Sequence, residues 1–304
     1  TLSPSSAASD VYKRQDLDYF RALVDCQNYT MVAKQFAVSQ PAVTQAIHRL
    51  EKEFAVKLVI QDRRHQQTNI TRAGQLLYKN ARQIQASLQL AHREIQSTLQ
   101  TDIRFGLPPI IGTLYFPQIA EKLLQNGLLQ QLKITETGSD ELLRKLVHGE
   151  INIALLGSYL PFDLPTVSAV HLGARPFSII VSPQNSLAKQ AAVSFKDLGQ
   201  AQFIGLDGKY VHPQAFRAYC DFAGVHPEVI YRTPDISWVK ALVKANLGIS
   251  LLVRDVVKAD DGVVCLEIKD QLPVSFNISV VTRAGYLPTT DEQRFIDQLL
   301  KMKI

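Results

Sequence analysis

The chain has 304 residues and a mass of 33.9 kDa, which at about 150 residues per domain predicts two or three domains. Its 46% hydrophobic and 20% charged residues are ordinary for a globular protein and exclude a wholly disordered chain. Three cysteines, Cys26, Cys220 and Cys265, lie far apart, which excludes a disulfide scaffold and zinc-ligand spacing and favours a reducing cytosol. No apolar run approaches the roughly 20 residues that span a bilayer, and residues 1–15 contain no apolar signal segment. We therefore expect a cytoplasmic protein.

The net charge of +5 is concentrated in the first third of the chain. Residues 1–100 hold 13 Lys and Arg against 8 Asp and Glu, whereas residues 101–304 hold 20 of each class. A basic module on a neutral body favours a nucleic-acid partner. A bias of this size also arises by chance in proteins that bind no nucleic acid.

The first residues predict three short helices after a Ser/Ala-rich stretch. Residues 1–15 are expected to be a disordered or extraneous tail. Apolar residues at helical spacing predict a first helix over 16–26, and Thr30 is expected to cap a second helix. Ser39 is expected to cap a third helix with Pro41 in its first turn, where a proline costs no hydrogen bond. The apolar face of this third helix is predicted to consist of Val43, Ile47, Leu50 and Phe54.

Two short apolar segments, 58–60 and 68–70, flank a basic loop and predict a hairpin, the wing of a winged helix. Thr71 is then expected to cap a long helix, because residues 75–100 contain no Gly or Pro. Small and apolar residues of this helix recur at intervals of 4, 3, 4, 3 and 4, forming a heptad seam of Leu77, Ala81, Ile84, Leu88, Ala91 and Ile95. We expect a partner helix at this seam; the alternative is a surface helix that packs on its own domain.

After Gln100 the pattern changes to alternating strands and helices. Strands over 103–107, 132–137 and 151–156, with helices at about 110–125 and 139–148, predict a parallel sheet. The alternation is repeated with strands over 177–181, 203–206 and 249–253 and helices at about 212–223 and 236–246. A last strand over 275–282 and a helix from about 290 are expected to return to the first sheet.

The predicted fold class is therefore an α winged helix-turn-helix domain followed by an α/β domain with two lobes. The winged domain spans 16–73, the linker helix 74–100 and the α/β domain 101–304. We expect one lobe over 101–166 and 273–304, a second over 167–272, and a ligand cleft between them.

The predicted third helix leaves small or polar side chains pointing outward, namely Gln40, Ala42, Thr44, Gln45, His48 and Arg49. Such side chains near a helix N-terminus suit a helix that reads base edges in the major groove of DNA. The alternative is an ordinary three-helix bundle with a solvated polar face.

At this point the sequence resembles a known family. The segments SQPAVTQAIHRLE (39–51) and KLVIQDRRHQQTNITRAG (57–74) resemble the N-terminal domain of LysR-type transcriptional regulators, and the resemblance extends over 16–304. FGLPPIIG (105–112) and INIALLGS (151–158) resemble the regulators of malolactic fermentation within that family. The resemblance implies a winged-helix DNA reader, a dimerising linker helix and an effector domain like the periplasmic binding proteins.

The resemblance also implies contacts to double-stranded operator DNA from the third helix, its surroundings and the wing: Thr30, Gln40, Pro41, Thr44, Gln45, Arg49, Arg63 and Arg64. His48 is either a further DNA contact or a solvated side chain. Ala37 and Val38 depart from the family pattern, because many members carry Asn or Gly in this turn.

Two strand-to-helix junctions, at Pro108-Pro109 and at 137–139, are expected to bring helix N-termini to one sheet edge and form an anion site. The resemblance implies the same cleft positions: Pro109, Ile110, Ile111, Gly112, Thr113, Ser139, Ser158, Leu206 and Asp207. These segments contain no Lys or Arg, so backbone amides and hydroxyls are expected to hold a small carboxylate, with Lys209 and His212 as weaker candidates. The subgroup makes L-malate the first ligand to try. The alternative for Ser139 is a simple helix cap.

Other classes of protein find little support. The sequence contains no phosphate-binding Gly loop, no nucleophile elbow and no His-x-x-x-His pair among its seven histidines, so we predict no catalysis, metal or cofactor. Asp260-Asp261-Gly262 is predicted to be a turn. A stand-alone solute-binding protein would have similar lobes but no heptad-linked basic module. The sequence therefore favours a regulator, which we expect to assemble as a homodimer or homotetramer. RNA polymerase is a further candidate partner.

Overall fold

A computed structural model describes residues 4–62, 67–207 and 211–304, with side chains over 14–60, 68–207 and 211–304. The chain divides into two units, residues 1–92 and 93–304, each of which is described by itself. No helix in these ranges is long and apolar enough to cross a membrane.

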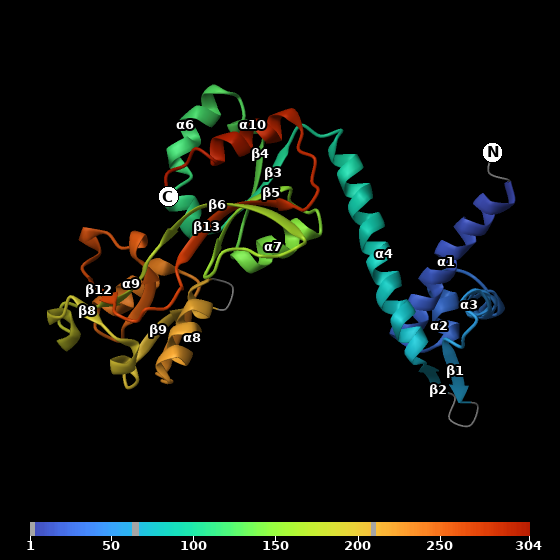
Figure 1. Cartoon of the computed structure of the whole chain (residues 1–304), viewed down its shortest axis with the longest axis horizontal. Helices are drawn as coiled ribbons and strands as arrows, with labels where there is room; N and C mark the ends of the chain where they lie inside the picture. Colours follow the sequence, from blue (N-terminus) through green and yellow to red (C-terminus); the bar gives the residue numbers. More distant parts are fainter. Residues whose placement is uncertain (1–3, 63–66, 208–210) are drawn as a thin grey trace. The chain divides into compact units, whose positions relative to one another are not determined.

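Helices and one hairpin make up the first unit: α1 (Pro4–Cys26), α2 (Tyr29–Gln35), α3 (Gln40–Glu53), β1 (Val59–Asp62), β2 (Gln67–Ile70) and most of α4 (Arg72–Ser97) (Figure 1). The first helix begins at Pro4 and not at Asp16 as predicted. No Gly or Pro interrupts the chain between Pro4 and Cys26, so the helix includes most of the stretch that was predicted to be disordered or extraneous, and from Pro4 on that stretch is helical.

Side-chain caps fix the starts of α2 and α3. The side chain of Asn28, and not Thr30 as predicted, caps α2 by accepting the backbone N–H of Met31 at 3.0 Å. Ser39 caps α3 as predicted, by accepting the N–H of Ala42 at 3.3 Å. Each cap satisfies one of the N–H groups that a helix N-terminus leaves without an intrahelical partner.

An apolar core holds α1, α2 and α3 together, and the predicted anchors Val43, Ile47 and Leu50 are buried in it. Phe54 is not the fourth anchor that the spacing predicted, because it is 49% exposed. The reason is that α3 ends at Glu53 and the chain then reverses through Ala55, whose φ of 51° is left-handed.

The hairpin is confirmed, with β1 and β2 pairing antiparallel from Val59 opposite Ile70 to Asp62 opposite Gln67. Thr71 caps α4 as predicted, because its Oγ1 accepts the N–H of Gly74 at 3.0 Å. Position 74 must be glycine, since a Cβ there would overlap the carbonyl oxygen of Leu58. The start of α4 therefore lies directly against β1.

In the second unit, the first lobe is built on a five-stranded sheet in the order β4-β3-β5-β13-β6. Its strands are β3 (Ile103–Leu107), β4 (Leu132–Glu136), β5 (Ile153–Ser158), β6 (Val167–Arg175) and β13 (Phe276–Arg283). The strands β4, β3 and β5 run parallel, and β13 returns antiparallel between β5 and β6, as expected for the last strand. The helices are α5 (Pro109–Leu114), α6 (Pro117–Gln125), α7 (Ser139–Val147) and α10 (Thr290–Leu299), with a short 3-10 turn η1 (Leu129–Gln131).

Helices cover both faces of this sheet (Figure 1). On β5, Ile153 and Leu155 belong to the core that includes residues of α6 and α10, whereas Ala154 and Leu156 pack with Leu142 of α7. This alternation is the two-residue period of a strand. The predicted single helix over 110–125 is two helices, because α6 starts anew at Pro117.

The second lobe has a four-stranded sheet in the order β11-β7-β12-β8 and a parallel pair β10-β9, joined by a bridge between Phe203 and Ile249. Its strands are β7 (Phe177–Val181), β8 (Ala192–Val193), β9 (Phe203–Leu206), β10 (Val229–Thr233), β11 (Ser250–Val253) and β12 (Val264–Ile268). Its helices are α8 (Val211–Ala223) and α9 (Ile236–Lys244), with 3-10 turns η2 (Ser186–Lys189), η3 (Phe195–Leu198), η4 (Arg254–Val256) and η5 (Ala259–Asp261). Gly262, with a φ of 70°, completes the predicted turn after η5.

The boundary between the lobes differs from the prediction. Residues 167–175, assigned from sequence to the second lobe, form β6, which pairs with β13 along its length and so belongs to the first sheet. The chain enters the second lobe at Pro176 and leaves it before Phe276.

Candidate functional site

The outward face of α3 carries polar side chains, as the sequence predicted. Gln40, Pro41, Gln45, His48 and Arg49 are exposed, and Thr44 is half-buried. The hydroxyl of Thr30 on α2 donates to Oε1 of Gln40 at 3.4 Å, so α2 and the start of α3 share one polar surface. This surface has the short side chains that fit against base edges.

Arg49 has an intramolecular partner that the sequence did not indicate. Its Nε donates to Oδ2 of Asp16 at 2.7 Å and its Nη2 to Oδ1, which makes a two-pronged ion pair between α3 and α1. Asp16 is 3% exposed, whereas the Arg49 side chain is 49% exposed. The guanidinium therefore neutralises a buried carboxylate and fixes the angle of α3 on α1.

Glu51 is a second buried carboxylate, and it joins α3 to the hairpin. One oxygen accepts the N–H groups of Leu58 (3.0 Å) and Val59 (3.4 Å), and the other accepts from Lys57 Nζ at 2.6 Å. Burial alone would raise the pKa of Glu51, but these hydrogen bonds and the one from His48 together lower it. No periodicity in the sequence could have indicated this role.

Arg63 and Arg64, the predicted wing contacts, lie outside the described residues, as does Lys209.

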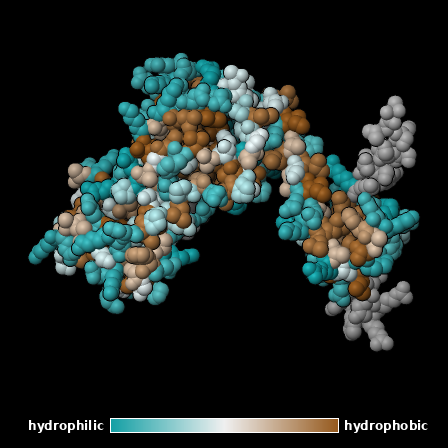
Figure 2. Space-filling model, viewed as in Figure 1, coloured by the Kyte–Doolittle hydropathy of each residue, from teal (hydrophilic) through white to brown (hydrophobic). Residues whose placement is uncertain are grey.

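The heptad seam on α4 changes character along the helix. Leu77 packs against the core of the first unit and Ala81 is buried. Further along, Ile84 is 49% exposed and Ile95 is 68% exposed. Figure 2 shows hydrophobic surface along this helix. The second half of the seam thus presents an apolar stripe to solvent.

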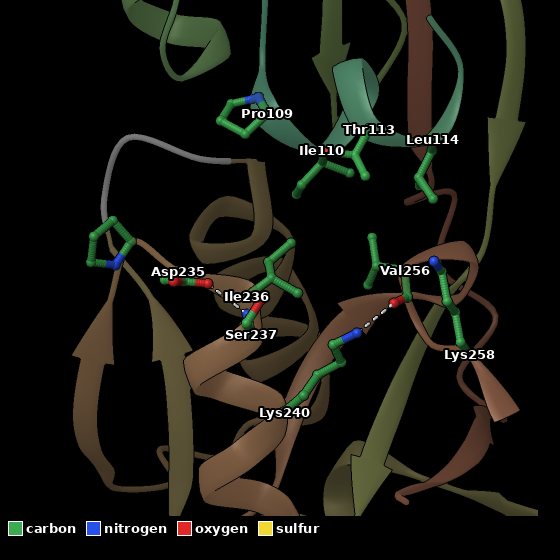
Figure 3. Close-up of a pocket in the computed structure, with 11 residues that line it drawn as sticks. Pro109, Ile110, Thr113, Leu114, Asp235, Ile236, Ser237, Lys240, Val256 and Lys258 are labelled. Carbon is green, nitrogen blue, oxygen red and sulfur yellow. Dashed lines mark hydrogen bonds between the residues drawn. The ribbon is translucent and has the colours of Figure 1, made fainter. Parts of the chain in front are cut away.

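A cavity of about 450 Å³ lies between the two lobes of the second unit (Figure 3). Its lining comes from the first lobe through α5, and from the second lobe through α9, η4 and the residue before η5: Pro109, Ile110, Thr113, Leu114, Pro234, Asp235, Ile236, Ser237, Lys240, Val256 and Lys258. Volumes of about 300–1,000 Å³ are typical of small-molecule sites.

Two lysines, Lys240 and Lys258, line the cavity, and neither was predicted from the sequence, which offered Lys209 as a weaker candidate. Nζ of Lys240 donates to both carboxylate oxygens of Asp261 at 2.7 Å and to the Val256 carbonyl at 3.2 Å, so its three N–H groups are used. Lys258 is exposed and forms no ion pair within 4.0 Å among the described residues, although its charge acts on the nearby Asp261 carboxylate. Of the two lysines, Lys258 is therefore the one more available to a bound anion.

The structure brings together only part of the predicted effector set. Pro109, Ile110 and Thr113 line the cavity, but Ile111 is fully buried in the core and Gly112 faces Leu107, because these two lie on the inner side of α5.

The other predicted positions, Ser139, Ser158, Leu206 and Asp207, are not among the described residues that line the cavity. Ser139 is the first residue of α7 and not its cap, and its buried hydroxyl accepts the N–H of Gly157 at 3.0 Å. His212 is fully buried, and its Nε2 accepts the N–H of Val253 at 3.2 Å, so it faces the interior of the second lobe.

Polar contacts also join the lobes beside the cavity. Asp255 of η4 accepts from the hydroxyl of Tyr115 at 3.0 Å and pairs with Arg175 Nε at 2.9 Å. On the other side, Gln214 of α8 donates to Asp140 of α7 at 2.8 Å. A ligand between α5 and α9 would add to these ties.

Comparison with known families decides the class. Residues 14–75 match the bacterial regulatory helix-turn-helix protein family of LysR type, and residues 96–303 match the LysR substrate binding domain. The chain belongs to the LysR family. It is a DNA-binding transcriptional regulator with an effector-binding domain, and not an enzyme.

Several proteins resemble this LysR regulator over most of its length. The malolactic fermentation system transcriptional activator of Lactococcus lactis is 30% identical over 291 residues, 95% of this chain and 98% of that protein. HinK, a LysR family regulator from Pseudomonas aeruginosa, shares the fold with a TM-score of 0.53 at 23% identity, over 95% of this chain and 97% of that one. The effector-binding domain of QuiR, solved in complex with shikimate, has a TM-score of 0.59 at 15% identity, over 66% of this chain and 96% of that domain.

Proposed function

We propose that this regulator responds to a small organic carboxylate, with L-malate as the first candidate, bound in the cavity between α5 and α9. The observation that carries the proposal is a 450 Å³ interlobe cavity with the Lys258 ammonium in its lining. The 30% identity to an activator of a malolactic system, over nearly the whole chain, directs the choice to malate. Ser237 and Thr113 supply hydroxyl groups in the same lining, which suit the hydroxyl of a 2-hydroxy acid.

The test is a titration of the full chain with L-malate, D-malate, succinate and L-lactate. The only tryptophan of the chain, Trp238, lies on α9 beside the lining residue Ser237 and is 57% exposed, so its fluorescence is the first signal to follow, with calorimetry as the independent measurement. We expect saturable binding of L-malate and a rise in its Kd of about fivefold for Lys258→Gln, which is about 1 kcal/mol for an exposed ion pair. Lys196→Gln, an exposed lysine outside the lining, is the matched control.

The same titration distinguishes two positions for the ligand. The hydroxyl of Ser158, at the end of β5, is buried with no hydrogen-bond partner among the described residues. Ser139, the first residue of α7, lies nearby, because its hydroxyl accepts the N–H of Gly157, the residue before Ser158. If Ser139→Ala weakens L-malate binding and Lys258→Gln does not, the carboxylate binds at Ser139, Ser158 and the Leu206-Asp207 region. If no acid in the panel binds, the proposed effector class is wrong.

We further propose that α3 reads operator DNA in the major groove through Gln40, Thr44, Gln45 and His48. Thr30, Pro41, Arg63 and Arg64 are proposed to contact the sugar-phosphate backbone. Gln45→Ala is expected to relax base preference at one or two operator positions, at a cost of about 1–3 kcal/mol. Loss of Arg63 and Arg64 is expected to weaken all sequences alike and to lower the salt slope by about one for each arginine.

For assembly, we propose that the exposed half of the seam, Ile84 to Ile95, pairs with a second copy of α4. In the resulting homodimer, a two-fold axis would relate the two copies of α3 that read DNA, and two such dimers would form a homotetramer. An interrupted palindrome is the operator that such a dimer recognises. RNA polymerase is a further proposed partner, on the grounds of the regulatory class alone.

A further inference from the structure

The guanidinium of Arg283, at the end of β13, is the centre of a buried polar cluster. Arg283 is 4% exposed, and Nη1 donates to the carbonyls of Leu146 (3.0 Å) and Ile151 (2.8 Å), while Nη2 donates to Oδ1 of Asn152 at 3.3 Å. Its Nε donates to Oε1 of Glu94 at 3.0 Å. Four of the five N–H groups of this guanidinium therefore have partners, and Glu94 is the carboxylate among the described residues that pairs with it.

Glu94 belongs to α4, the helix that leads from the effector domain toward the DNA-binding unit. It lies in the last turn of that helix, which ends at Ser97. The neighbouring Arg93 adds a second contact, because its Nη1 donates to the carbonyl of His148 at 2.5 Å. The end of the linker helix is thus fastened to the first lobe by an ion pair at β13 and by the turn after α7.

The opposite end of β13 lies where the two lobes meet. Phe276 packs edge-on against Phe177 of the second lobe, with ring centroids 6.2 Å apart, and its ring lies 5.9 Å from that of His212. The next residue, Asn277, donates to the carbonyl of Ser158 at 3.4 Å. One strand therefore joins the interlobe region at Phe276 to the linker helix at Arg283.

This strand is suited to carry a displacement over its whole length. It is paired on both sides, with β5 and β6, and all but one of its eight residues are buried. At about 3.3 Å per residue its ends lie about 23 Å apart. A strand held in this way moves as a unit with its sheet, because close-packed interiors transmit strain.

We propose that the Arg283–Glu94 ion pair couples the state of the interlobe cavity to the linker helix. The pair positions α4 and contacts neither DNA nor the effector. The proposal uses the effector site proposed above, but the contact itself is tested without any effector. It assigns a role in signal transmission to Glu94, which no sequence motif distinguishes from other solvent-facing residues of α4.

Glu94→Ala is the informative variant. Glu94 is 39% exposed, and Arg283 keeps its bonds to Leu146, Ile151 and Asn152, so the domain is expected to fold. Glu94→Gln retains an acceptor oxygen without the charge. Its duplex-dependent change in amide exchange at residues 276–283 is expected to lie between those of the wild type and Glu94→Ala. Glu121→Ala, an exposed carboxylate on α6 of the same lobe, is the matched control.

The experiment uses the full chain and a DNA duplex selected by the protein from random sequence. Amide hydrogen exchange is measured with and without this duplex, and operator affinity with and without L-malate. In the wild type and in Glu121→Ala, we expect the duplex to change exchange at residues 276–283 by at least twofold. In Glu94→Ala that change is expected to disappear, although duplex affinity and L-malate affinity stay within twofold of wild type.

The outcomes separate this proposal from the proposed function. If the duplex leaves exchange at 276–283 unaltered in the wild type, or if Glu94→Ala responds as the wild type does, the coupling role is overturned. If L-malate fails to bind, the effector proposal fails while the exchange measurement still decides the role of Glu94. Where L-malate binds, its effect on operator affinity in Glu94→Ala is expected to fall toward none.

Discussion

Replacing Arg49 tests whether this side chain positions α3, the helix proposed to read DNA, or contacts DNA itself. The structure places its guanidinium on the buried carboxylate of Asp16, 33 residues earlier in the chain. Arg49→Ala removes both hydrogen bonds and leaves Asp16 charged and without its ion-pair partner in the interface between α1 and α3.

The expected loss of stability is about 3 kcal/mol. Two hydrogen bonds to charged groups contribute about 1.5–3 kcal/mol each, and breaking a buried pair by removing one partner costs about 3–5 kcal/mol. Asp16 is 3% exposed, so the figure for a buried pair applies, but Arg49 is 49% exposed, so water reaches the carboxylate once the guanidinium is gone. The lower end of the range follows.

Amide hydrogen exchange over 16–50 measures this loss within the first unit, where the single tryptophan does not report. Asp16→Asn combined with Arg49→Gln should be less destabilised than the sum of the single changes by at least about 1 kcal/mol. Arg49→Lys keeps the charge but loses the fork, so it should lower stability without altering the salt slope of DNA binding. Stability of Arg49→Ala within about 0.5 kcal/mol of Lys52→Ala, an exposed lysine on the same helix, would refute the positioning role.

Three further changes test other parts of the molecule. Ala37 has a left-handed φ of 53°, so Ala37→Asn should stabilise the first unit by about 0.5–1 kcal/mol in thermal unfolding; an unchanged or lower midpoint would contradict this. Leu88→Glu places a charge in the seam, so sedimentation should show smaller species and operator binding should fall; the wild-type mass would mean that no partner helix covers Leu88. Burial lowers the pKa of His212 to about 3, below its unfolded value near 6.5, so the unfolded chain binds the extra proton. The contribution of neutral His212 to the free energy of unfolding of the second unit should therefore be fully present above pH 6.5 and fall toward pH 3, by up to about 1.4 kcal/mol per pH unit. His212→Gln should remove this pH dependence.

Local chemistry in the sequence predicted the helices and the hairpin of the first unit well. The anchors Val43, Ile47 and Leu50 follow helical spacing, and the Ser39 cap satisfies an N–H only three residues away. The errors were also local. Asn28 and Thr30 are equally plausible caps two residues apart. Nothing in the apolar pattern shows that the helix ends at Glu53, so that Phe54 lies outside it and the chain reverses at Ala55.

Contacts between distant segments were beyond the sequence. The pairing of Arg49 with Asp16 requires the angle between α1 and α3, which helical periodicity does not contain. Strand β6 was placed in the wrong lobe because strand order in a sheet is set by tertiary pairing and not by position in the chain. Lys258 reaches the cavity from a turn 148 residues after Ile110, so no search around the strand-to-helix junctions could find it.

The topology explains why one ligand can govern the effector domain. The second lobe is inserted between β6 and β13 of the first sheet, so two chain crossings connect the lobes. The polar ties across the cleft that the structure describes are those of Asp255 with Tyr115 and Arg175, and of Gln214 with Asp140. Each such bond contributes about 1 kcal/mol net, and a ligand at about 100 times its Kd stabilises the form that binds it by about 2.7 kcal/mol. The two quantities are of similar size, so a ligand that touches both α5 and α9 shifts the interlobe geometry to the extent that it binds one arrangement of the lobes more tightly.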